Sequence, residues 1–252
     1  MNLLAIDTAC SVLSIAAAKG GEILYTETDA GTKHSEIIMY YIDSLMKEIS
    51  LKPQDLNGIL CMGGPGSFTG LRIGYSIAKG LALSLSIPFI PIPTLDCITY
   101  QLQMKNEQLT GKLVLSVIES RKGSFYYAFY KDGERLTADA DGTAGQIAEA
   151  LSAYPQLLES NPLNPPATTW HVTKNIEKSK KIILTGPAAS LLYDTLPPGL
   201  KAAVFPDSES RGYAKELIFT AKNKKLFDND NSAFLYAGPQ YVRKTDAELS
   251  QK

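Results

Sequence analysis

Short apolar runs broken by small polar residues and glycines open the chain, and helical spacing follows them. Three strand-like runs come first, and the pair Gly20–Gly21 marks a turn between the second and the third. Beyond them, apolar residues recur every three or four positions up to a turn marked by Pro53. The predicted elements are strands at 3–7, 13–18 and 22–27, a helix at 33–49, a strand at 58–62, a helix at 71–85 and a strand at 89–92.

A similar order returns after Lys112 in a weaker form. Strands are predicted at 113–123, 124–130, 181–186 and 202–205, with 135–139 as a further candidate, and helices at 143–153, 213–223 and between the last two strands. Residues 155–180 have little periodicity and form an irregular excursion. A tandem pair of βββαβα units predicts the α/β actin-like (ASKHA, ribonuclease H-like) fold class, with one lobe at 1–105 and a second, degenerate lobe at 106–252.

Composition narrows the function classes. The 252 residues are 44% hydrophobic and 20% charged, which is typical of a globular protein with a substantial core. The 25 Lys and Arg against 26 Asp and Glu give 25 − 26 = −1, so no overall positive field draws nucleic acid to the chain. Cys10, Cys61 and Cys97 cannot all pair within one chain, which indicates free thiols and a cytoplasmic setting. No membrane span is expected, because no long apolar run lacks a charge or proline.

A glycine-rich segment between a predicted strand and a predicted helix is the first candidate for chemistry. Backbone amides at such a place can bind an anion, and Gly64, Gly66 and Ser67 would supply them. Asp7 and Thr8 follow the first strand, where kinases of this fold place a metal-facing acid. The segment matches neither a Walker A loop nor a dinucleotide fingerprint. A tight structural turn is therefore the alternative, and glycine serves that purpose far more often.

Small residues repeat at every fourth position of the predicted helix at 71–85 and its first turn. They are Gly70, Gly74, Ala78 and Ala82, which share one helix face with almost no side chain on it. Glycine in a helix costs up to about 1 kcal/mol relative to alanine, so close packing must offset this cost. The packing partner is either the protein's own sheet or a helix of another chain. Met39, Tyr40 and Met46 add apolar surface to the first helix, which indicates a second contact there.

Several segments together resemble one known family. They are MGGPGSFTGLRIG at 62–74, Asp7-Thr8 on the opening strand, His34-Ser35-Glu36, IESRKGSFYYAFY at 118–130 and PQYVRKTDAE at 239–248. This pattern resembles the bacterial TsaB (YeaZ) family, whose members are actin-like proteins of the tRNA threonylcarbamoyladenosine pathway. The resemblance implies a non-catalytic scaffold subunit that contributes to tRNA modification only indirectly, with no cofactor of its own.

The resemblance also implies partners. It indicates a heterodimer with the catalytic paralogue TsaD through the first two helices, the ATPase TsaE as a further component, a homodimer when alone, and a candidate ATP or ADP site at the contact with TsaD. The residues that it assigns to partner binding are His34, Ile38, Met39, Gly70, Arg72, Gly74, Ala78 and Ala82. Tyr241 and the following Arg243 and Lys244 are a candidate contact for RNA or a partner, with a solvated tail as the alternative.

Other functions remain as alternatives. TsaD binds metal through an HxxxH pair, but here Ile38 stands where the second histidine would be, so no metal site is expected. An M22-type peptidase is the weakest alternative, because the chain has no HExxH motif and no serine triad that can be named. An independent ATPase or small-molecule kinase would use Asp7 as its metal acid. A binding module without a link to tRNA is the last alternative.

Overall fold

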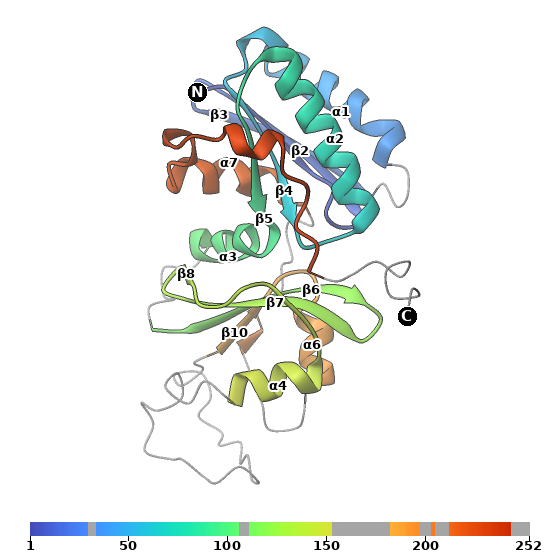
Figure 1. The fold of residues 1–252 in the computed structure, drawn as a ribbon, viewed down its shortest axis with the longest axis vertical. Helices are drawn as coiled ribbons and strands as arrows, with labels where there is room; N and C mark the ends of the chain where they lie inside the picture. Colours follow the sequence, from blue (N-terminus) through green and yellow to red (C-terminus); the bar gives the residue numbers. More distant parts are fainter. Residues whose placement is uncertain (30–33, 106–110, 153–181, 197–202, 205–211, 243–252) are drawn as a thin grey trace. The chain divides into compact units, whose positions relative to one another are not determined.

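The computed structural model describes the chain except for residues 30–33, 106–110, 153–181, 197–202, 205–211 and 243–252 (Figure 1). The chain divides into two units. Unit 1 consists of Met1–Cys97 together with Glu209–Lys252, and unit 2 consists of Ile98–Ser208. The predicted lobes at 1–105 and 106–252 therefore need a correction, because the last part of the chain belongs to the first unit. The predicted excursion at 155–180 lies outside the described residues.

Unit 1 is built on a five-stranded sheet with the order β3-β2-β1-β4-β5. Its strands are β1 (Leu3–Asp7), β2 (Val12–Lys19), β3 (Glu22–Asp29), β4 (Gly58–Gly64) and β5 (Phe89–Pro93). β2 runs antiparallel to β1 and β3, whereas β1, β4 and β5 are parallel. The turn between β2 and β3 contains Gly20 and Gly21, both with positive φ, which glycine adopts without steric cost.

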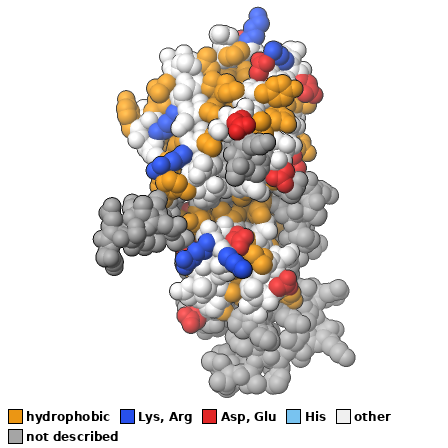
Figure 2. Space-filling model, turned by 90° about the vertical axis from the view of Figure 1, so that its right-hand side faces the viewer, with side chains coloured by type: hydrophobic (Ala, Val, Ile, Leu, Met, Phe, Trp, Pro, Cys, Tyr) orange, Lys and Arg blue, Asp and Glu red, His pale blue; other side chains and the backbone are white. Residues whose placement is uncertain are grey.

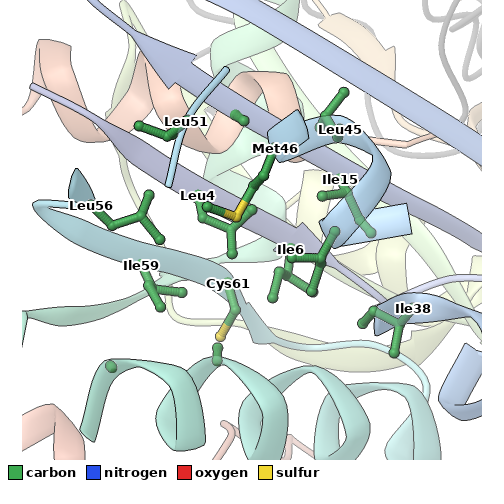
Figure 3. Packing of buried hydrophobic residues seen from close by; sticks show 14 of the residues in the cluster. Leu4, Ile6, Ile15, Ile38, Leu45, Met46, Leu51, Leu56, Ile59 and Cys61 are labelled. Carbon is green, nitrogen blue, oxygen red and sulfur yellow. The ribbon is translucent and has the colours of Figure 1, made fainter. Parts of the chain in front are cut away.

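Helices cover both faces of this sheet. α1 (His34–Glu48) and α2 (Phe68–Leu85) pack against the face that carries Leu4, Ile6 and Ile59 (Figure 3). Because side chains alternate along a strand, Asp7 of β1 and Ser14 of β2 lie on the other face. α7 (Ala214–Asn223) contacts β1, β2 and β4, and its first residues bond to Asp7 and Ser14. The central strands β1, β2 and β4 are therefore buried between two helical layers, whereas β3 at the edge is half-buried or exposed.

The segment after α7 continues along unit 1. It contains the short 3-10 helices η2 (Leu226–Asp228) and η3 (Ser232–Leu235). Phe234 and Leu235 pack against the core under α1 and α2, and the amide of Gln240 donates to the carbonyl of Gly63 at 2.8 Å. A 3-10 turn, η1 (Pro53–Asp55), precedes β4, and α3 (Thr94–Lys105), which the sequence did not predict, follows β5.

Unit 2 repeats the strand order of unit 1, with shorter helices and shorter outer strands. Its six-stranded sheet has the order β11-β10-β6-β7-β8, and β9 also pairs with β7. Its elements are β6 (Leu113–Arg121), β7 (Ser124–Lys131), β8 (Glu134–Arg135), β9 (Ala140–Thr143), α4 (Ala144–Ser152), β10 (Ile182–Thr185), α6 (Ala189–Thr195) and β11 (Ala203–Val204). β6, β10 and β11 are parallel and β7 is antiparallel to β6, as β1, β4, β5 and β2 are in unit 1. The predicted fold class, two actin-like lobes of which the second is degenerate, is confirmed.

Candidate functional site

The small-residue stripe of α2 faces its own sheet. Ala78 and Ala82 are buried, and a Cβ atom at Gly70 would overlap the backbone oxygen of Thr8. The Thr8 hydroxyl donates to the carbonyl of Gly70 at 2.7 Å, which draws helix and strand together. Gly74 lies against the same hydroxyl. The prediction that these residues contact a partner is therefore wrong, since the close packing that they allow is internal.

The partner residues predicted on α1 differ in their exposure. Ile38 is fully buried in the core between α1 and the sheet, so its side chain cannot reach a partner (Figure 3). Met39 and Tyr40 are 49% and 70% exposed, which leaves them accessible. His34 is the first residue of α1, and its side chain lies outside the described set.

The outward face of α2 carries a second row of small and apolar residues that the sequence analysis missed. Thr69, Ser76, Gly80 and Leu83 are exposed at helical spacing. Among the described residues, a Cβ atom at Gly80 would have no neighbour within 4 Å, so no close packing in this part of the chain requires a glycine there. We call these four residues with Met39 and Tyr40 the α1–α2 surface. Figure 2 shows hydrophobic side chains interspersed with charged ones on the side of unit 1 that carries both helices.

The glycine-rich loop between β4 and α2 is filled by the protein itself. Cβ atoms at Gly66 and Gly64 would collide with the backbones of Ala9 and Gln240. The Ser67 amide donates to the Ala9 carbonyl at 2.7 Å, and the Ser67 hydroxyl accepts from the amide of Gly70 as the N-cap of α2. These contacts agree with a tight structural turn. The predicted phosphate-binding role of Gly64, Gly66 and Ser67 finds no open loop here.

The side chain of Asp7 is hydrogen-bonded to the start of α7. Its Oδ2 accepts from the amide of Tyr213 at 2.8 Å and its Oδ1 from the amide of Ala9 at 2.9 Å. The pKa of Asp7 is raised to about 6: burial raises it most, the two amides lower it, and the charges of Glu216 and Glu27 add to the rise. Both oxygens of Asp7 therefore hold backbone amides of the chain itself, and the Thr8 hydroxyl is bonded to Gly70.

Two further acceptors extend this contact. Glu27 Oε2 accepts from the amide of Gly212 at 3.1 Å, and Ser14 Oγ accepts from the amide of Ala214 at 3.4 Å. The first amides of a helix have no partner within the helix and favour negative charge, so oxygen atoms from β1, β2 and β3 satisfy them. Within the described ranges, no group of three His, Cys, Asp or Glu side chains is placed to hold a metal ion.

Phe68, Arg72 and Tyr241 form an exposed cluster beside the start of α2, which we call the platform. The Arg72 guanidinium carbon lies 3.9 Å from the centre of the Phe68 ring, and the Phe68 and Tyr241 rings are 4.9 Å apart. Arg72 Nε donates to the Tyr241 hydroxyl at 3.2 Å. The structure thus brings a residue predicted in the tail onto a helix 169 positions away.

Two broader predictions concern thiols and membranes. Cys61 and Cys97 are buried, and burial raises the pKa of both thiols well above the usual range; Cys10 is partly exposed, and all three are free. Among the helices of the described segments, none is long and apolar enough to cross a membrane.

Comparison with known proteins finds relatives over most of the chain. A family model described as "TsaD: tRNA N6-adenosine threonylcarbamoyltransferase" matches residues 23–251. The chain is 27% identical to the TsaB protein of Bacillus subtilis, covering 98% of this chain and 96% of the relative. It is 34% identical to the TsaB protein of Escherichia coli over 73% of this chain and 78% of the relative.

A solved structure agrees with the sequence relatives. YeaZ from Pseudomonas aeruginosa shares the fold with a TM-score of 0.67 and 19% identity, over 95% of this chain and 99% of that one. A second Pseudomonas aeruginosa structure, described as an uncharacterized protein with similarity to peptidase YEAZ, gives 0.70 and 20%, over 96% and 99%. The chain therefore belongs to the family that the TsaD model describes and, within it, to the TsaB (YeaZ) family.

Proposed function

We propose that this chain is a non-catalytic subunit in tRNA threonylcarbamoyladenosine biosynthesis and that it binds the catalytic paralogue TsaD through the α1–α2 surface. The pathway is inferred from the names of its relatives, which are TsaB proteins of tRNA threonylcarbamoyladenosine biosynthesis. The proposed contact rests on the outward face of α2. There, exposed Gly80 and Ser76 have little or no side chain and lie between the larger apolar side chains of Ile73 and Leu83. Small residues let a second helix approach closely, and exposed apolar side chains around them supply contact area.

The chemistry of the first unit supports a role without catalysis. The residues that a kinase of this fold would use for metal and phosphate are Asp7, Thr8 and the β4–α2 loop, and all of them are bonded within the chain. The subunit then acts by holding TsaD in a productive geometry, which is a positioning effect, and contributes to tRNA binding only indirectly. An ATP or ADP molecule at the contact with TsaD, TsaE as a further component, and a homodimer without TsaD belong to the same proposal.

Gly80→Trp is expected to weaken the heterodimer at least 100-fold while leaving the fold intact. The indole would extend into the open space outside α2 without meeting a described residue near its Cβ, and it would block the approach of a partner helix. Gly145→Trp is the matched control, because Gly145 is an exposed glycine in α4 with only one neighbouring atom, at 3.9 Å. Titration calorimetry with TsaD measures binding, and thermal unfolding confirms the fold. Normal binding by Gly80→Trp would move the contact away from α2.

An independent ATPase or kinase is the second candidate function, and ATP turnover separates it from the first. The chain alone is expected to hydrolyse no ATP, and Asp7→Asn is expected to leave this background unchanged. The reason is that the Asp7 oxygens are occupied by the amides of Ala9 and Tyr213. Turnover by the wild type that disappears in Asp7→Asn would support the kinase instead. Phosphate release measured with and without TsaD decides between them.

A further inference from the structure

The platform is an exposed feature whose ligand the proposed function does not name. Phe68 and Tyr241 are 36% and 41% exposed, although aromatic rings of this size usually gain more by burial. Arg72 lies across the Phe68 ring and is itself exposed. Three exposed side chains that already contact one another form a preorganised surface, so a partner that binds them loses less conformational entropy.

The position of Tyr241 is fixed by the segment that carries it. Lys79 Nζ donates to the carbonyls of Leu235 and Ala237, and the amide of Gln240 donates to Gly63. Leu235 also packs against the core of unit 1. Because these anchors come directly before Tyr241, its ring is placed by the fold and does not belong to a solvated tail. The last described part of the chain is therefore part of the surface beside α2.

The charge of this surface has one sign. α2, the loop at 63–67 and the segment at 232–242 contain Arg72 and Lys79 and no Asp or Glu. The tip of Lys79 is bonded to carbonyl groups, so Arg72 is the cation that these segments present outward. Its Nε is held by Tyr241, and its terminal amino groups make no hydrogen bond within the described residues. A guanidinium held flat in this way suits a two-pronged bond to a carboxylate.

We propose that the platform binds an acidic segment of the protein partner, whose carboxylate pairs with Arg72 while a neighbouring apolar side chain packs on Phe68 and Tyr241. The inference rests on the proposed function, because it takes TsaD as the partner, and it adds the chemistry of the contact and the C-terminal segment as part of the interface. RNA fits the surface less well. Nucleic-acid binding needs many phosphate contacts, whereas these segments turn one guanidinium outward in a chain of net charge −1.

The test is the dissociation constant of the complex with TsaD at several salt concentrations. Arg72→Gln is expected to weaken binding at least about 30-fold and to flatten its salt dependence, because it removes one partner of a charge pair. Arg72→Lys keeps the charge but loses the planar fork, so it should recover only part of the affinity. Tyr241→Ala should weaken binding about 10-fold. Tyr236→Ala is the matched control, because Tyr236 is 91% exposed on the same segment and should change nothing.

The outcomes separate the two proposals. Normal binding by wild type together with unchanged affinity and salt dependence in Arg72→Gln and Tyr241→Ala would overturn this inference and leave the proposed function standing. Variants that keep the heterodimer but lower tRNA binding by the complex would assign the platform to RNA and also overturn it. If the wild type formed no complex with TsaD, the proposed function would fail and the inference with it. Unfolding curves of each variant confirm that the fold is intact.

Discussion

Gly70→Ala is expected to destabilise unit 1 by about 3 kcal/mol, a large fraction of the stability of an ordinary domain. The added Cβ would meet the backbone oxygen of Thr8, so α2 must move away from the sheet. That movement breaks the bond from the Thr8 hydroxyl to the Gly70 carbonyl and loosens the contacts of Ala78 and Ala82. Urea unfolding followed by circular dichroism measures the loss.

Gly80→Ala on the same helix is the control. A Cβ at Gly80 would meet no atom of the described segments within 4 Å, and alanine favours the helix over glycine by up to about 1 kcal/mol. This variant should therefore be slightly more stable than wild type. Opposite signs for the two substitutions would show that Gly70 is required by close packing and Gly80 is not. Equal stability of Gly70→Ala and wild type would mean that α2 lies farther from Thr8 than the structure shows.

The stability of unit 1 is expected to fall as pH rises from about 4 to about 6, through the ionisation of Asp7. The pKa of this carboxyl is about 6 in the folded protein against a reference value of 3.8, so between these values the folded state holds a proton that the unfolded state has lost. A difference of 6 − 3.8 ≈ 2.2 pH units corresponds to about 3 kcal/mol, present in full below pH 4 and absent above pH 6. The sign is opposite to that of a carboxylate in an ion pair.

Asp7→Asn isolates this contribution from those of all other carboxyl groups. Asparagine has no charge to bury and keeps an acceptor oxygen for one of the two amides, those of Ala9 and Tyr213, while its NH2 group faces the other. That mismatch lowers stability equally at every pH, so it does not change the shape of the pH dependence. Urea unfolding of both proteins at half-unit steps from pH 4 to pH 7 gives the difference in free energy. We expect wild type to lose about 3 kcal/mol relative to the variant across this range. Parallel curves would mean that Asp7 is more hydrated than its burial indicates.

Local patterns in the sequence predicted the elements of unit 1 well. The strands and helices up to β5 agree within a few residues, because each has the apolar period of its own structure and most have a glycine or proline near one end. The position of α7 could not be obtained in this way. Its contacts to Asp7, Ser14 and Glu27 span about 200 residues, and local periodicity does not specify which sheet a helix covers.

The orientation of α2 shows a similar limit. Spacing places Gly70, Gly74, Ala78 and Ala82 on one face, but it does not say whether that face meets the sheet or a partner. The contacts of Thr8 with Gly70 and Gly74 turn this face toward the sheet, and these residues come together only in the folded chain. Gly80 was the available signal for an exposed contact surface, since it lies outside the stripe and has no turn or cap to explain it.

Because α7 completes unit 1, this unit is made from two stretches that are far apart in the sequence. When the first 97 residues have left the ribosome, the strands of the sheet and helices α1 and α2 are available, but the helix that covers the other face of the sheet has not been synthesised. Three acceptors on the sheet lack their donors until about 110 further residues have been synthesised. The acceptors are Asp7, Ser14 and Glu27, and the donors are the amides of Tyr213, Ala214 and Gly212. The platform is consequently completed only after residue 241 has been synthesised, when Tyr241 reaches Phe68 and Arg72.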